Sequence, residues 1–406
     1  MNDLLERFLK VRQKTLDICK NLETEDFVIQ PTAFVSPIKW HIGHVTWFFD
    51  KLIAQKVLPS FQSGFSTYDK VFNSYYKSQG QHWIQERRGD LSRPTLNSIL
   101  EHRKIIDSAI IEILSSSGLD ERIKDLIIIG INHEEQHQEL ILMDIKYILS
   151  LNIENPIFEK SPLPISHKME KINNFILKEG IYELGHNASS FSYDNELPAH
   201  KVYLHGCELD NHFVSNGDYL EFIKDKAYEN PNLWLSDGWD WIQETKVKSP
   251  LYWRKGNSQW KEFTLHGEID LDLHSPVSHV NYYEADAFAK WKGKRLPLEA
   301  ELEQFYNSQL EIKSDKLNNI FHSTNTKQLE RNLWTWTQSP YTAYPGYKPF
   351  DGDVSEYNGK FMCNQYVLRG GCLFNTPEHY RKSYRNFYRP DQSWMFSGIR
   401  LAKDIK

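Results

Sequence analysis

The chain has few cysteines, no long apolar run and no excess of basic charge. Its 406 residues include four cysteines, at positions 19, 207, 363 and 372, far apart and without CxxC spacing. This usage argues against a disulfide scaffold and fits a reducing compartment, so we expect a cytoplasmic protein. No apolar run approaches the roughly 20 residues that span a bilayer, and charges occur throughout the N-terminal residues. We therefore expect neither membrane association nor a secretory signal.

Charge is balanced, with 48 basic and 54 acidic residues and a formal net charge of -6. This balance argues against nucleic acid as a partner, because such binding depends on phosphate neutralisation. Aromatic residues are plentiful, with 12 Trp, 21 Tyr and 22 Phe. Aromatic side chains fill cores, and their faces also suit a rigid pocket that holds a cation.

Residues 1–155 have the periodicity of a four-helix bundle. The apolar pattern predicts helices at about 2–21, from residue 36, within 91–114 after a Ser and a Pro, and at about 121–149. Ser36 is expected to cap the second helix, with Pro37 as its first residue. The connection at 59–92 is too long for a simple turn, and its aromatic content favours an ordered segment.

The composition and the hydrophobic pattern change after a proline-containing linker at residues 156–170. Residues 171–406 combine short β-like runs with many Gly, Asn, Asp and Trp residues, and predict helices at 215–227 and 282–293. This pattern indicates an α+β domain with long loops. The chain is therefore expected to be a multidomain protein with an α domain followed by an α+β domain.

Histidines in two of the predicted helices form a candidate metal site. In "HEEQHQEL", His133 and His137 lie one turn apart on one helix face. In "WHIGHVTWFFD", His41 and His44 follow a helix start among aromatic residues. A bundle can bring His44 to the other pair, which gives three neutral imidazoles and leaves open coordination positions. Imidazole ligands suit zinc, copper, iron and nickel.

Other classes remain open at this point. The HExxH spacing matches zinc hydrolases, in which Glu134 would act as general base and a third ligand would be needed. A noncatalytic metal-binding module would use the same histidines. A thiol transferase built on a three-histidine bundle would need no second domain of this length.

The C-terminal half contains, in order, "PVSHVNYYEADAFAKWKGKRLPLEAELE", "NLWTWTQSPY", "VLRGGCLFNTPEHYRKSYRNFYRP" and "FSGIRLA". This order resembles the formylglycine-generating-enzyme family, which implies a C-type-lectin-like fold. We expect Trp291, Arg295, Pro297 and Trp334 to hold that scaffold. The late cysteines do not stand at that family's copper-binding motif, so copper is not expected.

The N-terminal half resembles the DinB-like helix bundles, and the two halves together resemble the ergothioneine-pathway sulfoxide synthases. That resemblance implies that His44, His133 and His137 bind a nonheme Fe(II), with His41 as a neighbour and not a ligand. It also implies small-molecule substrates: hercynine (N-alpha-trimethylhistidine), a thiol and O2. Alternatives with the same chemistry are histidine as the acceptor, as in ovothiol synthesis, or a selenium donor.

Two branches of that family differ in the thiol they use. "RNFYRPDQSW" has Tyr388 and Gln392 where the gamma-glutamylcysteine branch carries charged residues, and "KPFDGDVSEYNGKF" does not fit that branch's tyrosine region. "FNSYYKSQG" resembles the tyrosine pair of the cysteine-using branch. By this resemblance Tyr75 and Tyr76 are candidate catalytic residues, and one of them would deliver a proton or hydrogen.

The resemblance also implies substrate contacts. Gln136, Asn386 and Phe387 are expected to contact hercynine, with Phe387 in place of the family's Trp. Arg87 and Arg88 are candidates for holding the carboxylate of cysteine, because a guanidinium binds a carboxylate with two parallel hydrogen bonds.

If the chain is such a synthase, Glu134 is not the general base that a hydrolase would require. Glu134 and Glu135 are then expected in supporting or surface positions.

Overall fold

The computed structural model describes residues 2–164, 166, 173–188, 190–257, 259–309, 321–324 and 330–405. The chain forms two compact units, Met1–Glu154 with Phe350–Tyr357 and Asn155–Pro349 with Asn358–Lys406. Residues 165 and 167–170 of the expected linker lie outside the described residues.

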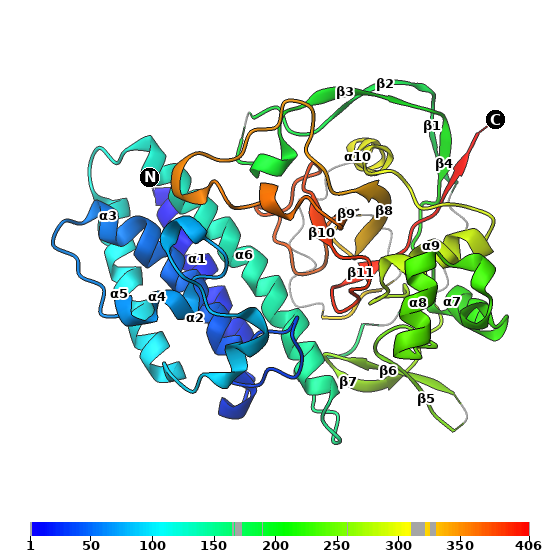
Figure 1. Ribbon diagram of the computed structural model, residues 1–406, viewed down its shortest axis with the longest axis horizontal. Helices are drawn as coiled ribbons and strands as arrows, with labels where there is room; N and C mark the ends of the chain where they lie inside the picture. Colours follow the sequence, from blue (N-terminus) through cyan, green and yellow to red (C-terminus); the bar gives the residue numbers. More distant parts are fainter. Residues whose placement is uncertain are drawn as a thin grey trace. The chain divides into compact units, whose positions relative to one another are not determined.

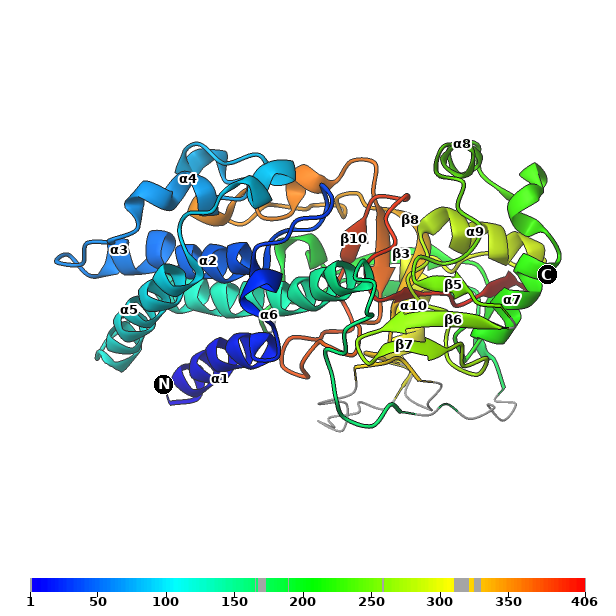
Figure 2. The same cartoon turned by 90° about the horizontal axis from the view of Figure 1, so that it is seen from below.

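The first unit is the expected helix bundle. Helices α1 and α2 pack against α6, and α5 packs against α2 (Figures 1 and 2). These long helices are α1 (Asn2–Cys19), α2 (Ile38–Phe49), α5 (Leu96–Ser115) and α6 (Glu121–Ser150). Every residue of α2 is buried, so this helix forms the centre of the unit. In the described part of the chain, no helix is both long and apolar enough to cross a bilayer.

The long connection after α2 is ordered, as its aromatic content suggested. A π-helical turn, Asp50–Ala54, extends α2 and leads into the short helix α3 (Gln55–Val57). Helix α4 (Asp69–Phe72) and short 3-10 turns at Ser66–Tyr68, Lys77–Gln79 and Gln85–Asp90 follow.

The expected start of α2 is wrong by one residue. Pro37 has ψ of 139° and lies outside the helix as its N-cap residue, so Ser36 does not cap it. The polar groups of Ser36 have other partners: its N–H donates to Asp144 Oδ2 at 2.9 Å, and its Oγ accepts from Arg88 at 2.9 Å. By contrast, the Thr95 side chain caps α5 by accepting from Ser98 N.

The second unit is the expected α+β domain. Its helices are α7 (Asn216–Lys224), α8 (Ser236–Thr245), α9 (Tyr282–Trp291) and α10 (Glu299–Asn307). Ser215 caps α7 and Asn281 caps α9, which confirms the two predicted helices.

The strands of this unit form small sheets (Figure 1). One sheet has the order β10-β9-β8-β11, with β8 (Trp334–Pro340), β9 (Tyr366–Arg369), β10 (Asn386–Tyr388) and β11 (Ser397–Gly398). A second has the order β1-β4-β12, with β1 (Phe175–Leu177), β4 (Cys207–Leu209) and β12 (Ala402–Asp404). The others pair β2 (Gly180–Leu184) with β3 (His200–Leu204), and β5 (Trp253–Lys255) with β6 (Trp260–Thr264) and β7 (Gly267–Asp270).

A short segment from late in the sequence, Phe350–Tyr357, belongs to the first unit. The sequence predicted a second domain of residues 171–406, which would have included this segment. In the structure Asp353 forms an ion pair with Lys56 and accepts from Gln79 Nε2 at 2.8 Å. Glu356 accepts from the N–H of Ser78 at 2.9 Å. The segment is therefore tied to the long connection of the helix bundle.

Gly43 permits the close approach of this connection to α2. A Cβ at this position would lie 2.1 Å from the Phe72 ring, a distance that no side chain tolerates. We expect Gly43→Ala to lower the free energy of unfolding by about 1–3 kcal/mol, because overpacking outweighs the helix propensity of alanine. Gly64 is the matched control, since nothing lies within 4 Å of its added Cβ. Chemical denaturation of both variants checks this, and equal stabilities would contradict it.

Candidate metal centre

Helices α2 and α6 bring three histidines together in the first unit. His44, His133 and His137 are all buried, and each offers a nitrogen within 4.8 Å of the others. His44 Nε2 lies 3.2 Å from His133 Nε2. The centroid of the His137 ring lies 4.8 Å from the His44 ring centroid and 4.7 Å from the His133 ring centroid. The structure therefore brings together the histidines that the sequence singled out, within the described part of the chain.

The imidazoles are uncharged at neutral pH. Burial lowers the pKa of His133 to about 3. Burial, followed by the proximity of the other histidines, lowers the pKa values of His44 and His137 well below the ordinary value. Neutral imidazole is the form that binds metal, because its unprotonated nitrogen carries the donor lone pair.

The lone pair of His44 can be placed from its hydrogen bonding. Its Nδ1 lies 2.6 Å from the carbonyl oxygen of Phe72. A carbonyl only accepts, so Nδ1 carries the hydrogen and Nε2 is left with a lone pair toward His133. Two imidazole nitrogens that face each other in this way can both donate a lone pair to one cation placed between them. The residues present thus fit a metal bound by three imidazoles, including nonheme iron(II).

Glu134 faces away from this centre. Its carboxylate accepts from Arg12 at 2.8 Å, Arg103 at 2.5 Å and Thr15 at 2.6 Å, all of which lie on α1 and α5. Burial works to raise the pKa of Glu134, but the charges of Arg103 and Arg12 and these hydrogen bonds lower it to about 2. A carboxylate held in this way has both oxygens occupied, which argues against the general base of a hydrolase.

Glu135 is also buried, and it pairs with Arg7 at 2.8 Å. The alternative of a surface position for Glu134 and Glu135 is therefore wrong. Their supporting role follows from their ion pairs, which join α6 to α1 and α5.

Arg87 and Arg88, both candidates for holding a carboxylate, differ sharply in their surroundings. Arg87 is exposed and pairs with Asp90 at 2.6 Å. Arg88 is buried with its guanidinium 3.3 Å above the Trp40 ring centroid, and Trp40 stacks on His44 at 4.7 Å. Arg88 donates to the hydroxyl oxygens of two serines, and none of the described carboxylates forms an ion pair with it. Burial lowers the pKa of Arg88 to about 9.

The tyrosine pair lies in the same unit. Tyr75 and Tyr76 stack with ring centroids 4.6 Å apart, and Tyr76 packs 6.0 Å from Trp47, which stacks on His44. The Tyr76 side chain is fully buried, its hydroxyl forms no hydrogen bond of normal geometry, and burial followed by the adjacent Tyr75 raises its pKa well above the ordinary value. A buried hydroxyl without such a bond costs about 1–3 kcal/mol, which a purely structural role does not explain.

A third tyrosine, Tyr357, reaches the centre from the late segment "KPFDGDVSEYNGKF", which by sequence does not fit a tyrosine region and was therefore set aside. Its ring packs edge-on against His133 at 5.8 Å, and its hydroxyl donates to Gln136 Oε1 at 2.6 Å. Its backbone carbonyl lies 3.5 Å from the Tyr75 hydroxyl. No local pattern could have indicated this contact, because it joins positions 221 residues apart.

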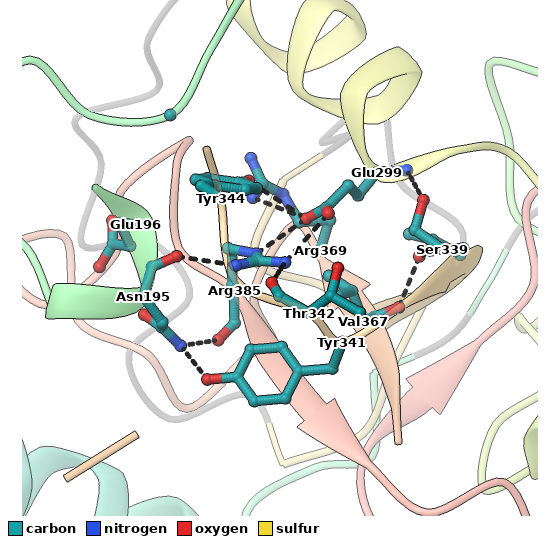
Figure 3. Close-up of polar contacts among 12 residues, drawn as sticks. Asn195, Glu196, Glu299, Ser339, Tyr341, Thr342, Tyr344, Val367, Arg369 and Arg385 are labelled. Carbon is teal, nitrogen blue, oxygen red and sulfur yellow. Dashed lines mark hydrogen bonds and ion pairs between the residues drawn. The ribbon is translucent and has the colours of Figure 1, made fainter. Parts of the chain in front are cut away.

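Asn386 and Phe387 belong to the second unit, on β10. Phe387 stacks on Tyr341 with centroids 4.0 Å apart, and its N–H donates to the side chain of Asn386. The preceding residue, Arg385, is fully buried and donates to Glu299 at 2.9 and 3.1 Å (Figure 3). Asn195 donates to the Tyr341 hydroxyl at 2.9 Å. This network orients the start of β10 and the two predicted contacts on it.

Comparison with known proteins identifies both parts of the chain. A family model described as a sulfatase-modifying factor enzyme 1-like domain matches residues 163–306 and 325–405. A second, described as the DinB superfamily, matches residues 7–141. These matches define a class in which a DinB bundle precedes a sulfatase-modifying-factor-like domain.

Similar proteins in bacteria and yeast specify the family. A protein named hercynine oxygenase in Mycobacterium tuberculosis is 31% identical over 308 residues, 68% of this chain and 70% of the relative. Another of that name in Mycolicibacterium thermoresistibile is 24% identical over 442 residues, 99% of this chain and 95% of the relative. Ergothioneine biosynthesis protein 1 of Schizosaccharomyces pombe is 27% identical over 232 residues, 53% of this chain and 28% of the relative. The chain belongs to the ergothioneine-pathway sulfoxide synthase family and is an oxidative enzyme.

The histidine cluster should make the metal-free protein sensitive to acid. The unfolded chain binds protons at these histidines below a pKa of about 6.5, whereas folded His133 does so only near 3. The free energy of unfolding should therefore fall as pH drops from about 6.5 toward 3, by about 1.4 kcal/mol per pH unit for each neutral histidine. Denaturation in EDTA across this range should show a smaller slope for His133→Gln. An identical slope would show that folded His133 titrates normally.

Proposed function

We propose that this protein is an iron(II)- and O2-dependent sulfoxide synthase that joins cysteine to hercynine. The carbon–sulfur bond forms at the imidazole ring and gives hercynylcysteine sulfoxide. One oxygen atom of O2 enters the sulfoxide and the other leaves as water, with the two hydrogens lost by the ring and the thiol. The buried cluster of three neutral histidines, in a chain of this family, carries the proposal.

His44, His133 and His137 would hold the iron. When bound, iron(II) supplies the electrons for O2 and coordination positions for the thiolate sulfur and a substrate nitrogen. Three neutral ligands add no negative charge of their own, so a thiolate can join them without repulsion from a protein carboxylate. The residues around the histidines exclude water, since Trp40, Trp47 and Phe48 are buried against them.

Arg88 is the better candidate for the carboxylate of cysteine. It is a buried cation without a described carboxylate partner, and its charge lies close enough to lower the pKa values of His44 and His137. A substrate carboxylate would offset the burial of this charge. Arg87 is exposed and already paired, which makes it the weaker candidate.

Gln136, Asn386 and Phe387 are the proposed hercynine contacts. Gln136 lies between the two histidines of α6, and its Oε1 already accepts from Tyr357. A trimethylammonium group has no N–H to donate, so aromatic faces such as that of Phe387 are what can attract it.

Tyr76 is the proposed proton or hydrogen donor. Its raised pKa keeps the proton on the hydroxyl oxygen at neutral pH, and the hydroxyl forms no hydrogen bond of normal geometry that would hold the proton elsewhere. Tyr75 stacks on it, and restricts the orientation of its ring.

An anaerobic assay tests the proposed reaction. The purified protein is loaded with Fe(II), given hercynine and cysteine, and exposed to O2, and mass spectrometry should detect hercynylcysteine sulfoxide. Parallel reactions with histidine, gamma-glutamylcysteine or a selenium donor determine the substrates. Absence of any coupled product and of thiol-dependent O2 uptake would overturn the proposal. Product with histidine but not hercynine would overturn the acceptor assignment alone.

Tyr76→Phe should lower the coupling rate by about 100-fold or more, in the range of a lost general acid. Thiol oxidation without coupling should then dominate the consumption of O2. Thermal stability should not fall, because the lost hydroxyl forms no hydrogen bond of normal geometry. Tyr147→Phe is the control, since Tyr147 lies on α6 of the same bundle and contacts Phe34. Unchanged coupling in Tyr75→Phe and Tyr76→Phe would remove the pair from the mechanism.

A further inference from the structure

A chain of buried hydrogen bonds lies behind one of the three histidines. His41 Nδ1 is 2.8 Å from His137 Nδ1, and His41 Nε2 is 2.9 Å from Asp144 Oδ2. All three side chains are at least nine-tenths buried. His41 precedes His44 by three residues on α2, and Asp144 follows His137 by seven residues on α6. These spacings place each pair on one helix face, so the two helices build the chain together.

The direction of these hydrogen bonds follows from the chemistry of the groups. Asp144 Oδ2 also accepts the backbone N–H of Ser36 at 2.9 Å. A carboxylate oxygen accepts and does not donate, so His41 Nε2 carries the hydrogen of that bond. When His137 binds a metal through Nε2, its own hydrogen lies on Nδ1 and needs an acceptor, and His41 Nδ1 at 2.8 Å is that acceptor. The hydrogen between the two Nδ1 atoms therefore belongs to His137.

A neutral His137 with its hydrogen on Nδ1 has its lone pair on Nε2. Nε2 is the nitrogen left for the cluster, because Nδ1 is already engaged with His41. The Phe72 carbonyl places the lone pair of His44 on Nε2 in the same way. His133 differs, since its Nδ1 has no hydrogen-bond partner. Two of the three imidazoles are thus held in the tautomer that can bind metal through Nε2.

We propose that Asp144 and His41 are positioning residues that hold His137 in its metal-binding tautomer and increase its electron donation to the metal. The inference rests on the proposed three-histidine metal site. A carboxylate that polarises a ligand imidazole through hydrogen bonds makes that ligand more basic and fixes its ring. Here the effect passes through a second imidazole, which serves as a link and not as a ligand.

The same unit contains a matched pair without this connection. His102 Nε2 lies 2.9 Å from Asp50 Oδ2, and both residues are buried. The His102 ring stacks on Phe65, and the other side-chain partners of Asp50 are Ser63 and Gln55. Neither residue hydrogen-bonds to a histidine of the cluster. Breaking this pair therefore measures the cost of losing a buried Asp–His contact in the bundle.

The test compares Asp144→Asn, His41→Gln and Asp50→Asn in the full-length protein. Asp144→Asn removes the carboxylate charge that polarises His41, and an amide nitrogen turned toward His41 Nε2 would also donate to it and put the hydrogen of His137 on Nε2. We expect Co(II) affinity to fall about 10- to 100-fold in this variant. His41→Gln keeps an acceptor for His137 Nδ1 but lacks the carboxylate, so its loss should be smaller. Asp50→Asn should bind Co(II) within about twofold of the wild type, because it touches no cluster histidine.

A second measurement needs no metal. The 15N chemical shifts of the His137 ring in the metal-free protein should report hydrogen on Nδ1 in the wild type and a shift toward Nε2 in Asp144→Asn. An unchanged tautomer together with unchanged Co(II) affinity would overturn the inference. Equal losses of affinity in Asp144→Asn and Asp50→Asn would also overturn it, since general destabilisation would then be the cause. A wild-type protein that binds no Co(II) would instead refute the metal site of the proposed function.

Discussion

Burial of three imidazole rings inside a helix bundle is the constraint on which the centre depends. A buried nitrogen needs a partner or a metal, because it has lost its water. His44 uses the Phe72 carbonyl and His137 uses His41, so their other nitrogens are left for the cluster. The close contact of Phe72 with Gly43 keeps that carbonyl in reach. The packing of the 59–92 connection against α2 therefore also determines which nitrogen of His44 is free to bind a metal.

Helix α6 carries two sets of polar residues in adjacent positions with different tasks. His133 and His137 face the cluster, while Glu134 and Glu135 form buried ion pairs with arginines of α1 and α5. Rotation of the helix would leave those carboxylates buried without a cation, which is strongly unfavourable. The ion pairs thereby hold the histidines in their orientation. They also explain why the HExxH spacing here does not produce a hydrolase arrangement.

Much of the bundle followed from the sequence, because helix periodicity and the spacing of His133 and His137 are local properties. That His44 lies next to this pair was predicted from the packing of helices in a bundle, and the structure places the three histidines together. The N-cap of α2 was misjudged, since Ser36 is engaged with Asp144 and Arg88 instead of the helix end. Arg87 and Arg88 are adjacent in sequence and could not be separated before their burial was known.

Spacing and motif order were sufficient for the class of fold, the histidines and the family, because each depends on neighbouring residues or on their order along the chain. Tertiary packing was needed for the rest. It placed Tyr357 against His133, turned Glu134 away from the cluster and connected Asp144 to His137 through His41. These contacts join separate helices or residues 221 positions apart, as for Gln136 and Tyr357. Only the folded chain brings such residues within hydrogen-bonding distance, and no local pattern encodes them.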